Sequence, residues 1–316
     1  MSQYTILVTG GAGFIGSNLV GELLKLGHSV RVLDNLMTGS KDNLKESFKE
    51  SKLHFIEGDI RDFDTCLSAC NGVDYVFHQA ALGSVPRSIK DPLTSNEVNV
   101  AGTLNVFYAS VQAKVKSVIY AASSSTYGDS QSLPKVEQVI GNPLSPYAIT
   151  KYVNELYADV FSKIYDIKFV GLRYFNVFGP KQNAAGAYAA VIPNFIQAIL
   201  KEEAPVINGD GSISRDFTYI DNVVQANLKA MESGNEIKNE VFNIALGSST
   251  TLSELYELLK KISGSDLLAQ YGSERMGDVQ HSLADISKAK KLLGYQPSVS
   301  VEEGLTKTFN WFKQEI

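Results

Sequence analysis

The chain has 316 residues and a mass of 34.4 kDa, enough for two domains of ordinary size or one large one. Its formal net charge of −5 at pH 7 argues against nucleic-acid binding, which usually needs a basic face. Two cysteines exclude a disulfide framework, and the i, i+4 spacing of Cys66 and Cys70 predicts buried thiols on one helix face. The four scattered histidines predict no metal site.

The chain also lacks the patterns that mark targeting and membrane insertion. Its first residues show no basic segment followed by an apolar run, which is the pattern of a secretory leader. No stretch approaches the roughly 18 apolar residues of a transmembrane helix. We therefore expect a cytoplasmic protein with no membrane partner.

Short β-rich runs alternate with helical patterns over the first half of the chain. Strands are expected at Tyr4–Thr9, Ser29–Leu33, Leu53–Glu57, Asp74–His78, Ser117–Ala122 and Ile167–Arg173. Helices are expected at Phe14–Leu26, Leu93–Ala113 and Tyr147–Tyr165. Because most of these strands are apolar on both faces, the alternation predicts an α/β fold with a doubly wound parallel sheet covered by helices on both sides.

This regularity weakens after about Arg173. Residues 175–213 are rich in loop signals, interrupted by one expected helix at Pro193–Lys201. A late strand is expected at Val241–Ala245, followed by an amphipathic helix at Thr251–Ser263. The pattern therefore predicts a smaller α+β unit in the C-terminal part.

A glycine pattern with Gly10, Gly13 and Gly16 follows the first expected strand and opens the first expected helix. Glycines in this context allow a sharp turn and close approach of the backbone to a pyrophosphate at the helix N-terminus. Asp34 ends the second expected strand, 18 residues beyond Gly16, where a carboxylate binds ribose hydroxyls and repels a 2′-phosphate. The pattern therefore predicts NAD as the cofactor rather than NADP.

Two further strand ends suggest cofactor contacts. Asp59 and Ile60 follow the third expected strand, within reach of an adenine ring. Gln79, Ala80 and Ala81 follow the fourth, where small side chains let a cofactor pass close to the backbone.

Tyr147 and Lys151 stand four residues apart and therefore share one face of an expected helix. A free phenol is a poor base at neutral pH, but a neighbouring ammonium and an oxidised nicotinamide would stabilise its phenolate. Ser123 and Ser124 follow the fifth expected strand, whose carboxyl end faces the ligand crevice of such a sheet. A serine hydroxyl there would orient and polarise an alcohol oxygen, so these four residues form a candidate proton-transfer set.

The chain resembles the extended short-chain dehydrogenases/reductases, more narrowly the nucleotide-sugar 4-epimerases and most of all bacterial UDP-N-acetylglucosamine 4-epimerases. The matching segments are Thr9–Gly16, His78–Ser88, Tyr120–Asp129, Gly141–Glu155, Gly171–Pro180, Gly186–Pro193, Asn208–Val223 and Arg275–Asp285. The resemblance implies a Rossmann-type fold, tightly held NAD, a UDP-sugar substrate and a homodimer formed through helices of each subunit.

The resemblance also implies a mechanism. Tyr147 takes the proton of the sugar 4-hydroxyl, Lys151 tunes this tyrosine and holds the nicotinamide ribose, and Ser123 binds the 4-oxygen with Ser124 nearby. The sugar C4 passes a hydride to NAD, the 4-keto sugar turns over, and the hydride returns to the opposite face, so NAD is retained.

Further contacts are expected by residue. For NAD they are Phe14, Ile15, Asn35, Thr38, Gly39, Asn99, Tyr174 and Val177. For the UDP-sugar they are Gly83, Ser84, Asn176, Ala190, Val191, Asn208, Arg215, Arg275, Asp278 and Ser282, with both arginines matched to the diphosphate and Asp278 to ribose hydroxyls.

Ser282 bears on the choice of substrate, because similar enzymes restricted to non-acetylated hexoses carry a tyrosine at this position. A serine leaves room for a 2-acetamido group, with Gly83, Ser84 and Ala190 as other walls. The chain has no acid directly after Ser123-Ser124-Ser125, which disfavours a sugar dehydratase or a uronate decarboxylase. A UDP-N-acetylhexosaminuronate 4-epimerase, with Arg87 available to a carboxylate, or a UDP-uronate decarboxylase remains an alternative, and so does a non-catalytic NAD-binding regulatory protein.

These segments also suggest the domain division. We expect residues 1–174 and 214–244 to form the NAD-binding domain, and residues 175–213 and 245–316 to form the UDP-sugar-binding domain. The chain would thus pass between the two domains more than once. A net charge of −5 is compatible with an anionic substrate, because Arg215 and Arg275 need be positive only inside one cleft.

Overall fold

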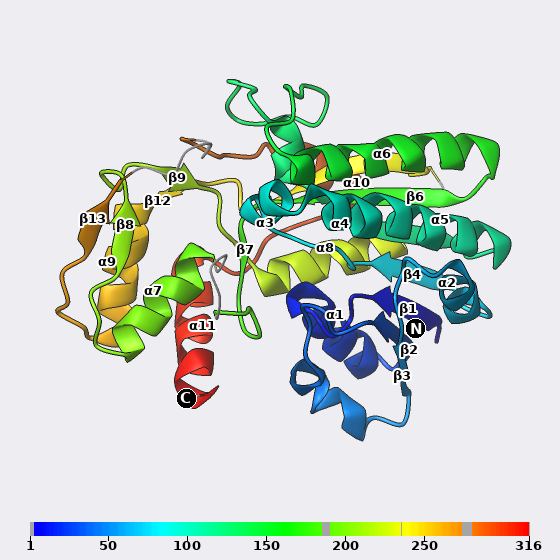
Figure 1. Cartoon of the computed structure of the whole chain (residues 1–316), viewed down its shortest axis with the longest axis horizontal. Coiled ribbons are helices and arrows are strands. Elements are labelled where there is room, and N and C mark those ends of the chain that lie inside the picture. The colour runs from blue at the N-terminus through cyan, green and yellow to red at the C-terminus, as the bar shows by residue number, and fades with distance from the viewer. Residues whose placement is uncertain (1–2, 185–189, 235, 274–279, 316) are drawn as a thin grey trace.

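The computed structural model describes residues 3–184, 190–234, 236–273 and 280–315. Figure 1 shows two groups of elements side by side. On the right is a large sheet with its helices, and on the left is a smaller group of helices and short strands. Arg275 and Asp278, both expected at the nucleotide, lie outside the described residues. No helix in the described part of the chain is long and apolar enough to cross a membrane.

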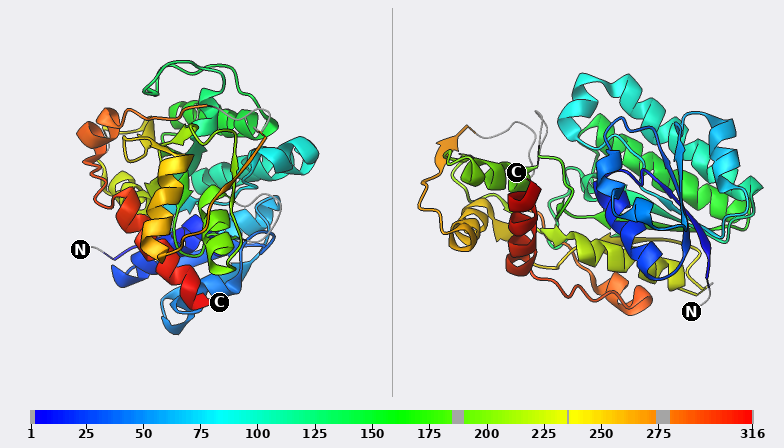
Figure 2. Two further views of the ribbon diagram at one scale, coloured as in Figure 1. Left: turned by 90° about the vertical axis from the view of Figure 1, so that its left-hand side faces the viewer. Right: turned by 90° about the horizontal axis from the view of Figure 1, so that it is seen from below.

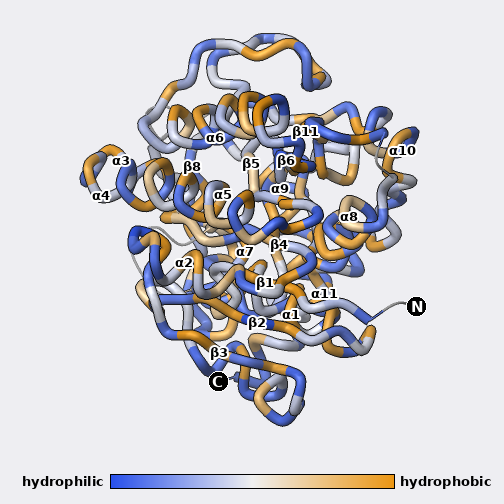
Figure 3. Tube along the Cα trace, turned by 90° about the vertical axis from the view of Figure 1, so that its right-hand side faces the viewer, coloured by the Kyte–Doolittle hydropathy of each residue, from blue (hydrophilic) through white to orange (hydrophobic). Residues whose placement is uncertain are grey.

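Within these ranges, seven parallel strands form the large sheet in the order β11-β6-β5-β4-β1-β2-β3, as Figure 3 shows from one side. Their bounds are β1 Thr5–Thr9, β2 Ser29–Asp34, β3 Leu53–Glu57, β4 Tyr75–His78, β5 Ser117–Ser123, β6 Lys168–Tyr174 and β11 Asn239–Ile244. The strand order reverses between β1 and β4, so the crevice at their carboxyl ends is the expected ligand site of a doubly wound sheet. The predicted fold class is confirmed.

Helices cover both faces of this sheet. On one face lie α1 Phe14–Lys25, α8 Ile220–Glu232 and α10 Ser287–Leu293. On the other lie α2 Phe63–Cys70, α5 Thr103–Gln112 and α6 Pro146–Ile164, joined by the short helices α3 Val85–Lys90 and α4 Pro92–Asn96. Successive side chains of a strand point to opposite faces, so Ile6 and Val8 pack with α1 while Leu7 joins the other core.

The smaller group of elements is built from two-stranded pairs and three helices, seen from two further sides in Figure 2. Its strand pairs are β7 Val177–Phe178 with β10 Thr218–Tyr219, β8 Val206–Asn208 with β13 Gln270–Gly272, and β9 Ser214–Arg215 with β12 Thr250–Thr251. Its helices are α7 Val191–Leu200, α9 Leu252–Ser263 and α11 Val301–Glu315. The helix α9 begins with a capping box between Thr251 and Glu254.

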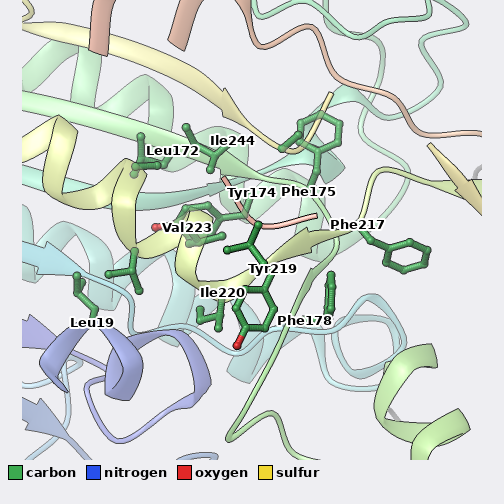
Figure 4. Packing of buried hydrophobic residues seen from close by; sticks show 14 of the residues in the cluster. Leu19, Leu172, Tyr174, Phe175, Phe178, Phe217, Tyr219, Ile220, Val223 and Ile244 are labelled. Carbon is green, nitrogen blue, oxygen red and sulfur yellow. The ribbon is translucent and has the colours of Figure 1, made fainter. Parts of the chain in front are cut away.

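One core runs from the large sheet into the smaller group. Figure 4 shows Leu172 and Ile244 of the sheet close to Val223 of α8, with Phe178 and Phe217 continuing towards the smaller group. Because buried aromatic rings bridge the two groups, they share an interface rather than a flexible linker.

Most predicted elements agree with the structure to within two residues, and two differences have physical causes. The single helix expected over Leu93–Ala113 is instead α4, a π-helical turn at Glu97–Gly102, and α5. The apolar spacing continues through the turn, so periodicity alone does not reveal it. The helix α10 packs against α8 and β11, although residues 245–316 were expected in the substrate unit. Tertiary packing, which periodicity does not encode, sets that position.

Cys66 and Cys70 lie on α2 as predicted, and both are buried free thiols. Burial raises the pKa of Cys66 to about 12 and that of Cys70 to about 11, so neither is a ready nucleophile.

Candidate active site

Three neighbouring cavities lie at the carboxyl edge of the sheet, and Asn176 borders all of them. We call them the dinucleotide, nucleotide and sugar cavities, with volumes of about 370, 250 and 230 Å³. The dinucleotide cavity is lined by residues at the ends of β1, β2 and β4, together with Tyr147 and Ser123. Asn176 follows β6 with φ +34, a left-handed conformation that asparagine tolerates better than most residues.

The glycine loop fits a pyrophosphate by close approach of its backbone. Gly10 has φ +68, and a Cβ on it would lie 2.6 Å from the amide nitrogen of Ala80. A Cβ on Gly16 would lie 2.2 Å from the carbonyl oxygen of Gly10. No side chain caps the N-terminus of α1 at Gly13, and the first residues of this helix line the dinucleotide cavity, which leaves their amides available to a pyrophosphate.

Asp34, at the end of β2, also lines this cavity and is buried. Its two carboxylate oxygens accept backbone hydrogen bonds from Ala12 at 2.9 Å and from Leu36 at 2.8 Å. Each oxygen keeps a further lone pair, so the fixed carboxylate can still accept from two ribose hydroxyls. A fixed carboxylate that binds ribose hydroxyls would repel a 2′-phosphate. The cavity, the glycine loop and this carboxylate therefore fit NAD.

Most of the residues expected at the cofactor line the dinucleotide cavity. They are Gly10, Gly13, Phe14, Ile15, Gly16, Asp34, Asn35, Thr38, Ile60, Gln79, Ala80, Ala81, Tyr147, Lys151, Tyr174 and Val177.

Three expected cofactor residues do not border the cavity. Gly39 packs against Ala12, where a Cβ would lie 2.7 Å from the carbonyl carbon. Asp59 is paired with Arg61, whose hydrogen bonds lower the pKa of the Asp59 carboxyl to about 2, and it accepts the Asn35 amide at 2.8 Å. The Asp59 carboxylate thus orients Asn35, which does line the cavity.

The third is Asn99, which is fully buried in the π-helical turn. Its side chain accepts from the Leu82 amide at 2.7 Å and donates to the Leu82 carbonyl at 3.1 Å and to Thr150 at 3.2 Å. These hydrogen bonds connect the loop that follows β4 to α6. Asn99 therefore holds backbone next to the cavity without lining the cavity itself.

Tyr147 and Lys151 lie on one face of α6, as their spacing predicts. The Lys151 ammonium is buried, donates to the Ala121 carbonyl at 2.9 Å and lies 6.0 Å from the Tyr147 ring centre. Burial lowers the pKa of Lys151 to about 8. Burial also raises the pKa of Tyr147, opposed by hydrogen bonding to Ser123, so the phenol needs added positive charge to ionise.

The serines after β5 have distinct environments. The Ser123 oxygen accepts from the Ser125 amide at 3.1 Å and from the Ser125 hydroxyl at 2.8 Å. With both lone pairs used, the Ser123 proton is left to donate to another oxygen. Ser124 lines the sugar cavity beside them. Ser125 was not among the expected site residues, and its role as a partner of Ser123 needed the turn geometry to be seen.

The predicted substrate residues divide between the cavities. Ala190, Val191 and Asn208 line the nucleotide cavity, and Ser123, Ser124 and Ser282 line the sugar cavity. Arg215 borders both, and Gly83 borders the dinucleotide cavity. Ser84 borders none of the three, because its hydroxyl caps α3 by accepting the Arg87 amide at 3.3 Å.

Ser282 is held at the sugar cavity by its own backbone. Its amide donates to the Ser214 carbonyl at 3.1 Å, and the preceding His281 bonds the Ser214 hydroxyl at 3.0 Å. These contacts fix the segment that, with Arg215, Ser123 and Ser124, lines the sugar cavity.

Several lining residues were not predicted. Phe195, Val206 and Phe217 line the nucleotide cavity, and Lys135 and His281 line the sugar cavity. The apolar residues gave no signal distinct from core positions. Lys135 and His281 belong to segments that only the fold brings to Ser123.

Comparison with known proteins agrees with this arrangement. Residues 6–245 match the NAD dependent epimerase/dehydratase family. The chain is 39% identical over 310 residues to a putative UDP-glucose 4-epimerase of Methanocaldococcus jannaschii, covering 98% of each chain.

Two solved structures superpose on nearly the whole chain. One is the UDP-N-acetylglucosamine 4-epimerase of Methanobrevibacter ruminantium in complex with UDP-N-acetylmuramic acid, with 42% identity, a TM-score of 0.95 and 100% of each chain covered. The other is the UDP-glucose 4-epimerase of Thermotoga maritima with UDP-glucose, with 41% identity, a TM-score of 0.93, and 98% of this chain and 99% of that one covered.

Proposed function

The chain belongs to the NAD dependent epimerase/dehydratase family, and from that premise we propose that it interconverts UDP-N-acetylglucosamine and UDP-N-acetylgalactosamine at C4. We include UDP-glucose and UDP-galactose as further substrates. The observation that carries the choice of an acetylated sugar is Ser282, a small side chain in the lining of the sugar cavity that also contains Ser123 and Ser124. A bulky ring at this position would occupy the volume that a 2-acetamido group needs.

In the proposed reaction, the phenolate of Tyr147 accepts the proton of the sugar 4-hydroxyl. Ser123 donates its remaining proton to the same oxygen, and the buried Lys151 ammonium stabilises the phenolate. NAD, when bound, supplies reversible hydride acceptance at the sugar carbon. The same phenol returns the proton after the sugar has turned, so Tyr147 ends each cycle as it began.

Arg215 supports the diphosphate part of the proposal. It lies between the nucleotide and sugar cavities, where a diphosphate joining a uridine to a sugar would pass. Its Nη1 atom donates to the backbone carbonyls of Ser214 and Gln280, which fixes the side chain at this junction. A guanidinium held in this way suits phosphate oxygens.

The proposal is tested by incubating the purified protein with UDP-N-acetylglucosamine and separating the product sugars by chromatography. We expect UDP-N-acetylgalactosamine to accumulate to equilibrium, and Tyr147→Phe to bind NAD but to lose turnover. The Ser287→Ala variant, which changes an exposed position on α10, serves as the control. Absence of UDP-N-acetylgalactosamine, or full activity of Tyr147→Phe, would contradict the proposal.

A UDP-N-acetylhexosaminuronate is the second candidate substrate. Lys135 lines the sugar cavity and is buried, and its ammonium donates to the Ser130 backbone carbonyl rather than to a carboxylate of the described residues. Together with Arg215 it would give a sugar carboxylate two cations in one cavity. Including the uronate in the same assay distinguishes the two, because turnover of the uronate alone would favour this candidate.

We further propose that the protein is a homodimer. An apolar stripe of Leu93 on α4 and Ile149, Leu156, Val160 and Ile164 on α6 is exposed to solvent, with Leu93 76% and Ile164 65% exposed. The spacing of the four α6 residues keeps them on one helix face. A second copy of this chain, paired through the same helices, would cover this stripe.

A further inference from the structure

The amide of the candidate base Tyr147 has a hydrogen-bond partner in another helix. The helix α6 begins at the N-cap Ser145, followed by Pro146, which has no N–H. The amides of Tyr147 and Ala148 therefore open the helix without a carbonyl of their own helix to bond. Ala148 donates to the Ser145 hydroxyl at 3.1 Å, which is an ordinary cap. Tyr147 donates to the hydroxyl of Ser88 on α3 at 3.0 Å.

The hydroxyl of Ser88 has only one orientation that satisfies its surroundings. Ser88 is fully buried, and its hydroxyl donates to the Val85 carbonyl at 2.8 Å. The proton is thus committed to α3, and an oxygen lone pair is left for the Tyr147 amide. A buried hydroxyl with one donor bond and one acceptor bond in fixed directions is a rigid connection between the two helices.

The other end of α3 lies at the sugar cavity. Val85 lines that cavity, and Gly83, two residues earlier, lines the dinucleotide cavity. The Ser88 amide donates to the carbonyl of Ser84, whose backbone has φ +110, a conformation that side-chain-bearing residues rarely adopt. One turn of helix therefore connects the loop beside the sugar to the backbone of Tyr147.

We propose that Ser88 is a positioning residue: its hydroxyl holds the Tyr147 amide and thereby sets the Tyr147 phenol relative to Ser123 and Lys151. This inference rests on the proposed function of Tyr147 as the base. Loss of the hydroxyl leaves a buried amide without a partner, and the start of α6 must shift to reach water or another acceptor. A shift there moves the phenol relative to Lys151, which lies one turn further along the same helix.

The test is Ser88→Ala, assayed on whichever UDP-sugar the wild-type protein turns over. We expect kcat to fall about 10- to 100-fold, because small misplacements of a reacting group have costs of this size, while KM changes less than about twofold. The acid limb of the kcat–pH profile should move upward, because a phenol displaced from Lys151 ionises at higher pH. A merely structural loss would leave that limb unchanged.

The matched control is Ser95→Ala on α4. Ser95 is also a buried helical serine, but its hydroxyl bonds only the Asp91 carbonyl of its own segment, at 2.8 Å. We expect this control to lose stability without a change in the pH profile. If Ser88→Ala does not fold, Ser88→Cys keeps the shape of the side chain with a slightly larger atom and weakens the acceptor, and the same fall in kcat is expected.

A folded Ser88 variant with wild-type kcat and an unmoved acid limb would overturn the inference. This outcome is distinct from failure of the proposed function. If Tyr147→Phe keeps full activity, the assignment of the base is wrong whatever Ser88 does. If Tyr147→Phe is inactive and Ser88→Ala is normal, only the positioning role is wrong.

Discussion

Single residues in this site depend on their immediate partners for their chemistry. His78 shows this by contrast: it bonds Thr9 at 2.7 Å and Thr103 at 2.9 Å, and burial lowers its pKa to about 3. It is therefore neutral at physiological pH and links β1 to α5 rather than exchanging protons. Tyr147, also buried, has Ser123 and Lys151 beside it. Burial thus makes His78 a structural group, whereas the neighbours of Tyr147 make that buried residue a candidate base.

The residue-scale prediction concerns Ser282→Tyr. A tyrosine at this position would fill part of a cavity of about 230 Å³ that contains Ser123 and Ser124 in its lining. We expect kcat/KM for UDP-N-acetylglucosamine to fall more than about tenfold and that for UDP-glucose less than about threefold, since only the former must fit an extra acetamido group.

Competition kinetics with both sugars measure this ratio. The control is Ser287→Tyr, five residues further on and exposed at the start of α10, which should leave both values unchanged. Equal losses on the two sugars with Ser282→Tyr would show that this position does not select the acetylated substrate.

At the scale of elements, a buried ion pair joins α6, the helix of Tyr147 and Lys151, to the sheet. Glu155 of α6 binds Arg173 of β6 through two bonds of 2.9 and 2.7 Å, and both side chains are at most 7% exposed. The Arg173 guanidinium also donates to the Glu137 carbonyl and lies 4.8 Å from the Tyr127 ring centre. The pair therefore connects α6, β6 and the loop before α6, which projects above the sheet in Figure 1.

We predict that Glu155→Gln lowers the free energy of unfolding by about 3 kcal/mol, because it leaves the Arg173 guanidinium buried without its counter-charge. Urea denaturation measures the change. Lys163→Ala is the matched control, since Lys163 and Asp159 form an exposed pair on the same helix at 2.7 Å, with an expected loss below about 0.5 kcal/mol. A loss from Glu155→Gln no larger than that of the control would contradict the prediction.

At the scale of the whole molecule, the proposed dimer is tested through the apolar stripe on α6. We predict that Leu156→Glu combined with Val160→Glu gives a monomer in light scattering coupled to gel filtration, because each added carboxylate would be buried without a partner. Lys229→Glu, exposed on α8 at the other face of the sheet, should remain dimeric. A wild-type chain that runs as a monomer would contradict the homodimer.

The fold and the positions of the candidate site residues could largely be predicted from local patterns. Gly10, Gly13 and Gly16 act through their own backbone and through the strand and helix beside them, so their spacing in the chain carries their role. The pair Tyr147 and Lys151 lies within one helix turn, where sequence separation fixes spatial separation. Strand periodicity likewise predicts the parallel sheet, because apolar runs buried on both faces occur in few other settings.

Other features were decided by contacts between segments distant in the chain. The pairing of Ser88 with Tyr147 spans 59 residues, and the pairing of Arg173 with Glu155 depends on β6 lying beside α6. The π-helical turn that carries Asn99 breaks no apolar pattern, and α10 joins the sheet through packing with α8 and β11. Local patterns thus determine elements and their chemistry, whereas hydrogen-bond partners of buried polar groups depend on the tertiary fold, since any suitable donor or acceptor it brings close can satisfy them.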